Sequence, residues 1–516
     1  MKRSNEKGTA MLFAIILVLV LSVMAASLMF LSQSETWGSM NYRQMTQSRY
    51  GAEAGLHAAA NYIMNTYKSP GNGGADPITA YNLNVSPVTA AGQAVVLSSL
   101  KGVSATYPVP AVQTAFSNSS NNSLTAGPNT VNYTSSAQLL SMRQVIQCGS
   151  NQPLTAQLWK LTSHGDMTGV RNAEVEVSAL LESHITPCYN YGAFATGSGC
   201  GSIQFTGGGA IDSYDSSNMT LSGGSPVVQT YDGNLGSNGN VNTAANTVIN
   251  GTFSSPDTGV GACSAGGVDA LSGNTTSVTG CINSTTCVPA PGLVKLPQAV
   301  VYTPPVTDYP GCSGAGVAAC DASIVTGLNG TPPPNPLTPG NYGDISQSGN
   351  GTVTLNPAGA NAATCTTGIY YINSISLNGN ASIKINPCPG TGGNGGNAPA
   401  QWAPVIINIV GSNQGTPLDL GGNGIANTTF NSSLLQFQYG GTGAIKIDGN
   451  GNSSAVVYAP GASVTLSGNG TIYGAVIGAQ LTANGNPVRI HYDRALSNNL
   501  FTLTNWTLDT FTWSKF

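Results

Sequence analysis

Residues 7–31 read KGTAMLFAIILVLVLSVMAASLMFL, and the rest of the chain is organised around this stretch. No ionisable side chain occurs in residues 9–31. The 22 residues from 10 to 31 rise about 1.5 Å each in a helix, which is enough to cross the roughly 30 Å hydrocarbon core of a bilayer. We therefore predict a membrane-spanning helix near the N-terminus.

The helical pattern continues beyond this apolar stretch, whereas a cleaved signal peptide usually opens onto irregular sequence. Small and apolar residues recur at three- and four-residue spacing over residues 37–63, and the first proline is Pro70. The sequence predicts one continuous helix over residues 9–69. Its first half is apolar on all sides, and its second half is amphipathic.

Lys7 and Gly8, placed directly before the apolar stretch, resemble the cleavage site of type IV prepilins. Residues 35–56 resemble the PilX-type N-terminal domain of minor pilins and pilus-assembly proteins. The resemblance implies that residues 1–8 are a leader, that a prepilin peptidase cuts between Gly8 and Thr9, and that the helix packs against other pilin subunits. Most pilins carry a glutamate five residues after the cut, where this chain has Phe13. That departure favours a minor pilin over a major one.

Composition divides the chain into two parts. All six glutamates lie at or before Glu182, so we place a domain boundary just after that residue. Charged residues make up 7% of the chain, glycine accounts for 66 of 516 residues, and the net charge is −4. Such a composition is typical of a surface-exposed, β-rich protein. It argues against nucleic acid as a partner, because phosphate binding needs clusters of Lys and Arg, and none follows Arg49.

Residues 70–186 predict a loop-rich β region, similar to the small antiparallel sheet that pilins fold against the second half of their helix. Apolar and polar residues alternate in 157–162 and again in 173–181, which predicts two strands. Residues 164–166 read His-Gly-Asp and are expected to form the turn between them. The side chains expected to face the helix are Leu161, Val175 and Val177.

From residue 187 onward the sequence repeats a short pattern in which Gly-Asn lies between apolar residues. Clear copies occur at 348–353, 377–383 and 466–472, and weaker copies begin near Leu271, Leu420, Ile447 and Gly485. The copies at 447 and 466 are 19 residues apart, which is near the length of one β-solenoid coil. Gly and Asn tolerate the left-handed backbone that a tight corner requires.

We therefore predict a right-handed parallel β-helix over residues 187–500, with a Pro-rich insertion at 289–339. A β-sandwich is the alternative, since short strands with turn signals are common to both. Residues 190–496 resemble an uncharacterised C-terminal β-helix domain that accompanies PilX-type N-termini. Residues 501–516 are aromatic and alternating, which predicts a strand that caps the last coil. The expected fold is mainly β, with one long N-terminal α-helix and a pilin-like sheet before the β-helix.

The chain has ten cysteines, none in a C-x-x-C pair and none spaced with histidine, which argues against a zinc site. A body that follows a membrane-crossing helix is expected in an oxidising compartment, where disulfides persist. Buried free thiols are the alternative. Eight cysteines fall in local pairs whose connectivity stays open: Cys188/Cys200, Cys281/Cys287, Cys312/Cys320 and Cys365/Cys388.

Catalytic β-helices need paired carboxylates, or a calcium site with a basic residue. Few groups here could supply either, because no glutamate follows Glu182. The groups considered are Asp212 with Asp215, Lys446 with Asp448, and His491 with Asp493 and Arg494. Turn caps, a cross-coil ion pair and a terminal polar cluster account for them more simply. We predict no catalytic residue, metal site or cofactor.

These observations predict a minor pilin-like, pilus-assembly or pilus-tip protein of a type IV pilus system. It would be anchored in the inner membrane by a single span, with its body in the periplasm, and would become extracellular once incorporated into a pilus. The β-helix would be displayed for adhesion to a surface glycan or a cell-surface ligand. The alternative is a membrane-anchored, carbohydrate-binding or carbohydrate-active β-helix that never enters a filament.

Overall fold

The computed structural model describes residues 6–70, 76–126, 129–148, 153–167, 172–243, 247–263, 267–273, 276–283, 285–310, 336–392, 394–395, 399–421, 423–448, 452–468, 471–485 and 488–515. The chain forms two compact units. The first comprises Met1–Val145, Pro153–Ile185 and Leu503–Phe516, and is here called the pilin unit because it contains the segment that resembles pilins. The second, here called the strand stack, comprises Ile146–Gln152 and Thr186–Thr502.

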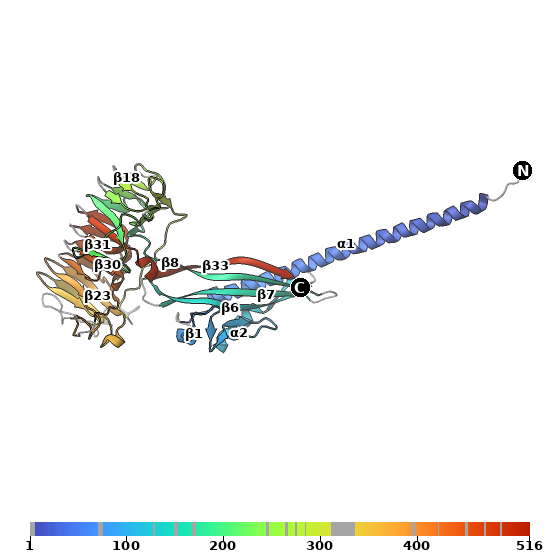
Figure 1. Cartoon of the computed structure of the whole chain (residues 1–516), viewed down its shortest axis with the longest axis horizontal. Coiled ribbons are helices and arrows are strands. Elements are labelled where there is room, and N and C mark those ends of the chain that lie inside the picture. Colours follow the sequence, from blue (N-terminus) through green and yellow to red (C-terminus); the bar gives the residue numbers. More distant parts are fainter. Residues whose placement is uncertain are drawn as a thin grey trace. The chain divides into compact units, whose positions relative to one another are not determined.

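Helix α1 runs without interruption over Glu6–Asn65 (Figure 1). Residues 9–43 are exposed along their whole length, and full burial begins at Ser48. By its length and composition, this helix could cross a membrane once. Its last third turns one face inward, where four residues at three- and four-residue spacing are buried: Ala52, Leu56, Ala59 and Ile63. The predicted division into an apolar part and an amphipathic part is confirmed.

Six strands form the main sheet of the pilin unit, in the order β33-β8-β7-β6-β4, with β5 paired to β6. Their bounds are β4 (Val96–Ser98), β5 (Asn122–Ala126), β6 (Asn129–Gln147), β7 (Pro153–Met167), β8 (Ala173–Pro187) and β33 (Leu500–Lys515). The unit also contains η1 (Ile78–Ala80), helix α2 (Pro110–Ser120) and a small antiparallel sheet of β1 (Tyr81–Asn82), β2 (Thr89–Ala90) and β3 (Gln93–Ala94).

The core of the pilin unit lies between α1 and the main sheet. Leu161, Val175 and Val177 are at most 2% exposed and join the helix residues Ala52 and Leu56 in one apolar cluster. The prediction that these three side chains face the helix is confirmed. Alternation in a half-buried strand was sufficient to predict them, because successive side chains of a strand point to opposite faces.

The predicted turn at residues 164–166 is wrong. His164, Gly165 and Asp166 lie inside β7 and pair with residues 174–176 of β8. Gly165 has a packing role instead, because a Cβ atom there would lie 2.0 Å from the carbonyl oxygen of Ser48 in α1. The glycine therefore marks the place where the helix backbone approaches the sheet most closely.

Strands of the second unit form one continuous stack in which all main-ladder pairings are parallel. The half nearer the N-terminus contains β9 (Ala193–Ala195), β10 (Ile203–Phe205), β11 (Gly209–Tyr214), β14 (Leu235–Ser237), β15 (Val241–Thr243), β16 (Thr247–Ile249), β17 (Phe253–Ser255), β18 (Leu271–Gly273), β19 (Thr276–Val278) and β20 (Leu293–Lys295).

The other half contains β21 (Gly340–Gln347), β22 (Thr352–Leu355), β23 (Gly368–Leu377), β24 (Ser382–Ile385), β25 (Val405–Ile409), β26 (Leu418–Leu420), β27 (Gly424–Ala426), β28 (Leu435–Tyr439), β29 (Ile445–Asp448), β30 (Asn452–Ser467), β31 (Thr471–Asn484) and β32 (Val488–Asp493). Short elements connect these strands: η4 (Ala362–Thr364), η5 (Ser432–Leu434), α3 (Leu496–Asn499) and the antiparallel pair β12 (Leu221–Ser222) and β13 (Ser225–Pro226).

The predicted 19-residue coil is found at one step of the stack, whereas coil length differs elsewhere, since Ile345 pairs with Ile375, 30 residues later. Ile447 pairs with Leu466, 19 residues later, and Leu466 pairs with Ala483 of the next coil. The Gly-Asn corners also behave as predicted, since Gly349 and Gly379 have positive φ angles of 66° and 70°. Asparagines at equivalent corners hydrogen-bond to one another, with Nδ2 donating to Oδ1 at 3.1 Å for Asn380 to Asn350 and at 2.9 Å for Asn386 to Asn356.

The coils do not stack in chain order. The first coil, β9 to β11, pairs on one side with β14, β15 and β16 and on the other side with β31 and β32. The chain therefore starts the stack in its middle and adds strands outward as far as β20. It then starts again at the opposite end with β21 and adds strands inward, until β31 and β32 pair with the first coil. Both edges of that coil are hydrogen-bonded, so the joint leaves no open strand edge.

The C-terminal strand was expected to cap the last coil, but most of it lies elsewhere. From Leu503 onward β33 belongs to the pilin unit, where it pairs with β8. Trp506 and Leu508 pack against that unit's core. An alternating pattern predicts a strand but does not identify its partner, and here the unpaired edge of β8 provides it.

Candidate functional site

The ends of β11 and β32 bring together residues that are far apart in the sequence. These strands pair in parallel, with Asp212 opposite His491 and Tyr214 opposite Asp493. The Nδ1 atom of His491 hydrogen-bonds with Oδ1 of Asp212, and both residues are at most 7% exposed. The imidazole also lies 4.6 Å from the ring of Tyr473, centroid to centroid. The pair is closed off inside the stack and supports the joint between the first and last coils.

Asp493 is fully buried and connects three segments of the chain. One carboxylate oxygen, Oδ1, accepts hydrogen bonds from the backbone N–H groups of Ser216 and Ala495, both at 3.1 Å. The other, Oδ2, accepts from the hydroxyl of Ser432 at 2.7 Å. Burial raises the pKa of Asp493 above its usual value, although these hydrogen bonds lower it in part. Its place in the fold indicates a structural role.

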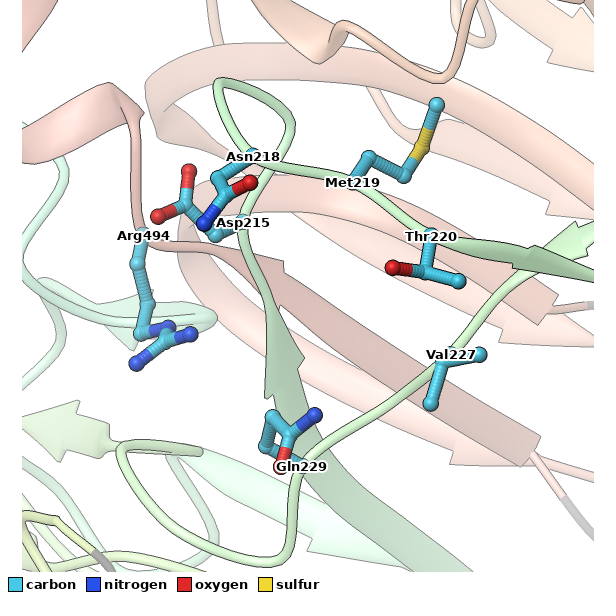
Figure 2. Close-up of a pocket in the computed structure, with 7 residues that line it drawn as sticks. All are labelled: Asp215, Asn218, Met219, Thr220, Val227, Gln229 and Arg494. Carbon is cyan, nitrogen blue, oxygen red and sulfur yellow. The ribbon is translucent and has the colours of Figure 1, made fainter.

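A cavity of about 190 Å³ lies at the surface next to this joint (Figure 2). Figure 2 shows Asp215, Asn218 and Arg494 on one side of it and Thr220 and Val227 on the other. The complete lining is Asp215, Asn218, Met219, Thr220, Val227, Gln229 and Arg494. The structure thus divides two of the predicted groups and exchanges their members. Asp212 pairs with His491 in the interior, whereas Asp215 and Arg494 line the same cavity.

The loop that frames the cavity is held closed at two places. Ser213 and Gln229 exchange backbone hydrogen bonds of 3.1 and 2.6 Å, and the N–H of Val227 donates to the carbonyl of Thr220 at 2.8 Å. Between these points one arm has six residues, 214–219, and the other has only Val228. The longer arm must therefore bow outward, which opens the cavity. Beyond it, the Gly223-Gly224 turn of the β12–β13 hairpin has φ angles of 61° and 82°.

Arg494 follows the last residue of β32, and its backbone N–H donates to the carbonyl of Tyr214 at 2.9 Å. Its Nη1 atom lies 3.5 Å from Oδ2 of Asp232, and its guanidinium lies 5.0 Å from the ring centroid of Tyr231. Burial raises the pKa of Asp232, and the nearby Arg494 partly lowers it. Among the described residues, the buried Nε–H of Arg494 has no hydrogen-bond partner. The guanidinium is therefore held in place beside Asp232 and Tyr231.

A second hollow, of about 370 Å³, borders the same hairpin. It is lined by Leu221 and Gly224 of the hairpin and by Asn423, Ile425, Ala426, Asn427, Thr428 and Phe430.

Sequence reasoning missed the lining residues Asn218, Thr220 and Gln229 of the first cavity. The Gly223-Gly224 pair between short polar and apolar runs is a hairpin signal that could have identified this loop.

Lys446, which was predicted together with Asp448, has a carboxylate of the adjacent coil as a neighbour. Lys446 lies with its Nζ atom 4.0 Å from Oδ2 of Asp419, which belongs to the adjacent coil. Coil stacking, which is absent from local sequence, supplies this cross-coil partner, while the side chain of Asp448 lies outside the described residues. Within the described ranges, no three His, Cys, Asp or Glu side chains are grouped so that they could hold a metal ion.

The disulfides connect Cys148 with Cys188, Cys200 with Cys263, Cys281 with Cys287, and Cys365 with Cys388. The local pairing of Cys188 with Cys200 is therefore not formed. Cys200 precedes β10 and Cys263 precedes β18, and these strands lie on one ladder with β15 between them. Stacking determines this pair, and neither Cys148 nor Cys263 was in the predicted set. Cys312 and Cys320 lie outside the described residues.

The residues assigned to pilin processing lie at the start of α1. Gly8 and Thr9 fall within the first turns of the helix. The side chain of Phe13 is 70% exposed, and the other residues in 9–43 are exposed as well. Residues 9–31 thus form an apolar stretch of helix that no other element covers within the described chain.

Comparison with known proteins agrees with this arrangement at the N-terminus. Residues 7–57 match the family described as PilX N-terminal, and residues 404–499 match a domain of unknown function (DUF7305). Among solved structures, the chain is similar to the competence-associated pilin ComZ from Thermus thermophilus, at 13% identity and a TM-score of 0.27 over 92% of this chain and 98% of that one. No curated protein matches. The match to the PilX family thus makes residues 7–57 a pilin-like N-terminal segment.

Proposed function

We propose that this protein is a minor pilin-like or pilus-assembly protein of a type IV pilus system, and that it displays its strand stack to external surfaces. The observation that carries the proposal is the division of α1 near Ser48. Residues 9–43 are exposed and the first 23 of them, residues 9–31, carry no ionisable side chain, whereas the following part of the helix contributes to the core of the pilin unit. A helix of this kind has one part for its own domain and one part for a membrane or for other subunits.

The exposed part cannot remain in water. Large apolar side chains such as Leu12, Ile15 and Leu19 are each more than half exposed. Burying each one stabilises the protein by about 1.5–3 kcal/mol. The inner membrane provides this burial before assembly, when the body occupies the periplasm, and neighbouring pilin helices provide it in the filament. A prepilin peptidase would cut after Gly8 and leave Thr9 as the mature N-terminus.

Phe13 stands where most pilins carry a glutamate that pairs with the amine of a neighbouring subunit. An aromatic ring cannot form that ion pair, so the chain should enter the filament rarely or at its end. The strand stack, which we propose to be wound as a right-handed parallel β-helix, would then face outward as an adhesive domain. Its four described disulfides suit an extracellular position, where thiols are oxidised.

Analysis of sheared, purified pili from the native host tests the proposal. Mass spectrometry of the N-terminal peptide should show a chain that begins at Thr9, and label-free quantification should find it far below the major subunit. An intact Met1, or a start near Ala26, would contradict the pilin assignment. Abundance equal to that of the major subunit would contradict the inference from Phe13.

A matched pair of glycine variants provides the control. Gly8→Val places a side chain at the cleavage position, so this variant should keep its leader and stay in the membrane fraction. Gly38→Ala changes an exposed helix position where a Cβ atom would have nothing within 4 Å. It lies 30 residues from the cut and should be processed like the natural chain.

A further inference from the structure

The cavity beside Arg494 combines hydrogen-bonding groups of every kind. Asp215 only accepts hydrogen bonds, Arg494 only donates them, and the amides of Asn218 and Gln229 and the hydroxyl of Thr220 do both. Met219 and Val227 add apolar surface between them. A ligand that matches this lining must itself carry several groups that donate and accept, arranged around a compact apolar skeleton.

We propose that this cavity binds one neutral sugar ring of a surface glycan, an assignment that rests on the proposed display function. The hydroxyl groups of a sugar each donate and accept, and its C–H groups supply apolar faces. The volume of about 190 Å³ is below the roughly 300–1,000 Å³ typical of sites for larger ligands. It suits a single ring, with the rest of the glycan outside.

Charge in and around the cavity argues against an ionic ligand. Asp215 lines it, and the guanidinium of Arg494 already lies 3.5 Å from the carboxylate of Asp232. These three groups together carry one excess negative charge, which disfavours a phosphate or a carboxylate. The guanidinium itself occupies the position beside the ring of Tyr231 where an organic cation would bind.

The cavity walls are held in place before any ligand arrives. The carboxylate of Asp493 accepts hydrogen bonds from the backbone N–H groups of Ser216 and Ala495. These residues directly follow Asp215 and Arg494, so one buried group fixes the backbone of both walls. Preorganised walls lose less conformational entropy on binding, which favours affinity for a small ligand.

Saturation-transfer NMR on the full chain in detergent micelles tests the assignment. The probes are glucose, galactose, mannose, fucose, N-acetylglucosamine and N-acetylgalactosamine, with inorganic phosphate, sialic acid and choline as charged comparisons. At least one neutral sugar should bind, and the charged probes should bind at least tenfold more weakly. Binding of a charged probe alone, or of no sugar, would overturn the assignment.

Variants locate the binding. Asn218→Ala and Thr220→Val alter exposed positions of the loop, so the fold should survive, and each should weaken sugar binding at least fivefold. Thr428→Ala, in the second hollow, is the control and should bind as the natural chain does. Sugar binding that is unchanged in both loop variants would place the ligand elsewhere and overturn the proposal.

The two proposals fail in different ways. A chain that begins at Thr9 in purified pili but binds no sugar would remove only the sugar site. A chain that binds sugar through Asn218 and Thr220 but keeps Met1 would remove the pilin function and leave the site intact.

Discussion

Asp493 shows how a single buried carboxylate holds the joint of the strand stack together. It lies at the end of β32, is fully buried, and accepts three hydrogen bonds from segments around residues 216, 432 and 495. Burial nevertheless raises its pKa, because removal from water disfavours the charged form more than these hydrogen bonds favour it. The ionised group therefore contributes less to stability than its contacts suggest.

Asp493→Asn should increase the free energy of unfolding at neutral pH. The amide can keep one accepting oxygen for the two backbone N–H groups and donate to the hydroxyl of Ser432. Because the folded-state pKa is raised, the natural chain has its full stability below the unfolded pKa of 3.8 and loses part of it as pH rises through the folded value. The advantage of the variant should grow over that window, by about 1.4 kcal/mol for each unit of pKa difference.

Denaturant titrations of the full chain in detergent, between pH 3 and pH 8, measure this difference. Asp308→Asn, at an exposed position, is the control for the loss of one negative charge, and the effect of Asp493→Asn is measured relative to it at each pH. An Asp493→Asn variant that becomes less stable than the natural chain as pH rises would show that the hydrogen bonds outweigh the burial.

The contact between α1 and the sheet depends on glycines. A Cβ atom at Gly55 would lie 2.3 Å from Oγ of Ser163 and 2.8 Å from Cδ2 of Tyr133. These distances are shorter than any normal contact of a Cβ atom, so the side chains of Ser163 and Tyr133, or the backbone that carries them, would have to shift. Glycine in a helix interior usually reduces stability relative to alanine, and here close packing offsets that cost.

Gly55→Ala should therefore destabilise the pilin unit. Overpacking costs about 1–3 kcal/mol, and the higher helix propensity of alanine offsets about 1 kcal/mol of that cost. Gly38→Ala lies on the same helix with nothing within 4 Å of its Cβ position, so it should be neutral or stabilising. Hydrogen exchange of β7 amides in the full chain distinguishes the two variants. Equal protection in both would mean that the sheet does not meet the helix at Gly55.

Three separated segments of the chain build the pilin unit, and the last of them follows the whole strand stack. The segment Leu503–Phe516 supplies β33 to the main sheet and places Trp506 and Leu508 against its core. The main sheet of the pilin unit thus includes a strand from the C-terminal segment of the chain.

Ending the chain after Thr502 should destabilise the pilin unit and leave the strand stack folded. The truncation exposes an edge of β8 and removes apolar side chains from the core. Hydrogen exchange should show lost protection at residues 173–181 and unchanged protection at residues 405–439. A chain ending at Trp513 keeps both core residues and should behave as the natural chain. Full protection of β8 in the shorter truncation would contradict this account.

Features that depend on neighbouring residues were predictable. The uninterrupted helix follows from spacing and from the lack of proline before Pro70. The Gly-Asn corners and the 19-residue step from Ile447 to Leu466 follow from a local repeat, whereas the length of the coil from Ile345 to Ile375 does not. The inward positions Leu161, Val175 and Val177 follow from alternation along a strand. Each of these is specified by backbone geometry over a few residues.

Long-range pairing was not predictable from such patterns. The partner of β33, the insertion of the first coil beside β31 and β32, and the pairing of Cys200 with Cys263 all depend on which strand edges remain open after folding. The same register brings Asp215 to Arg494, which follows it by 279 positions, and so forms the cavity. A local pattern states that a residue lies in a strand or a turn. It contains no information about the distant strand that hydrogen-bonding and burial select, so these features exist only in the folded chain.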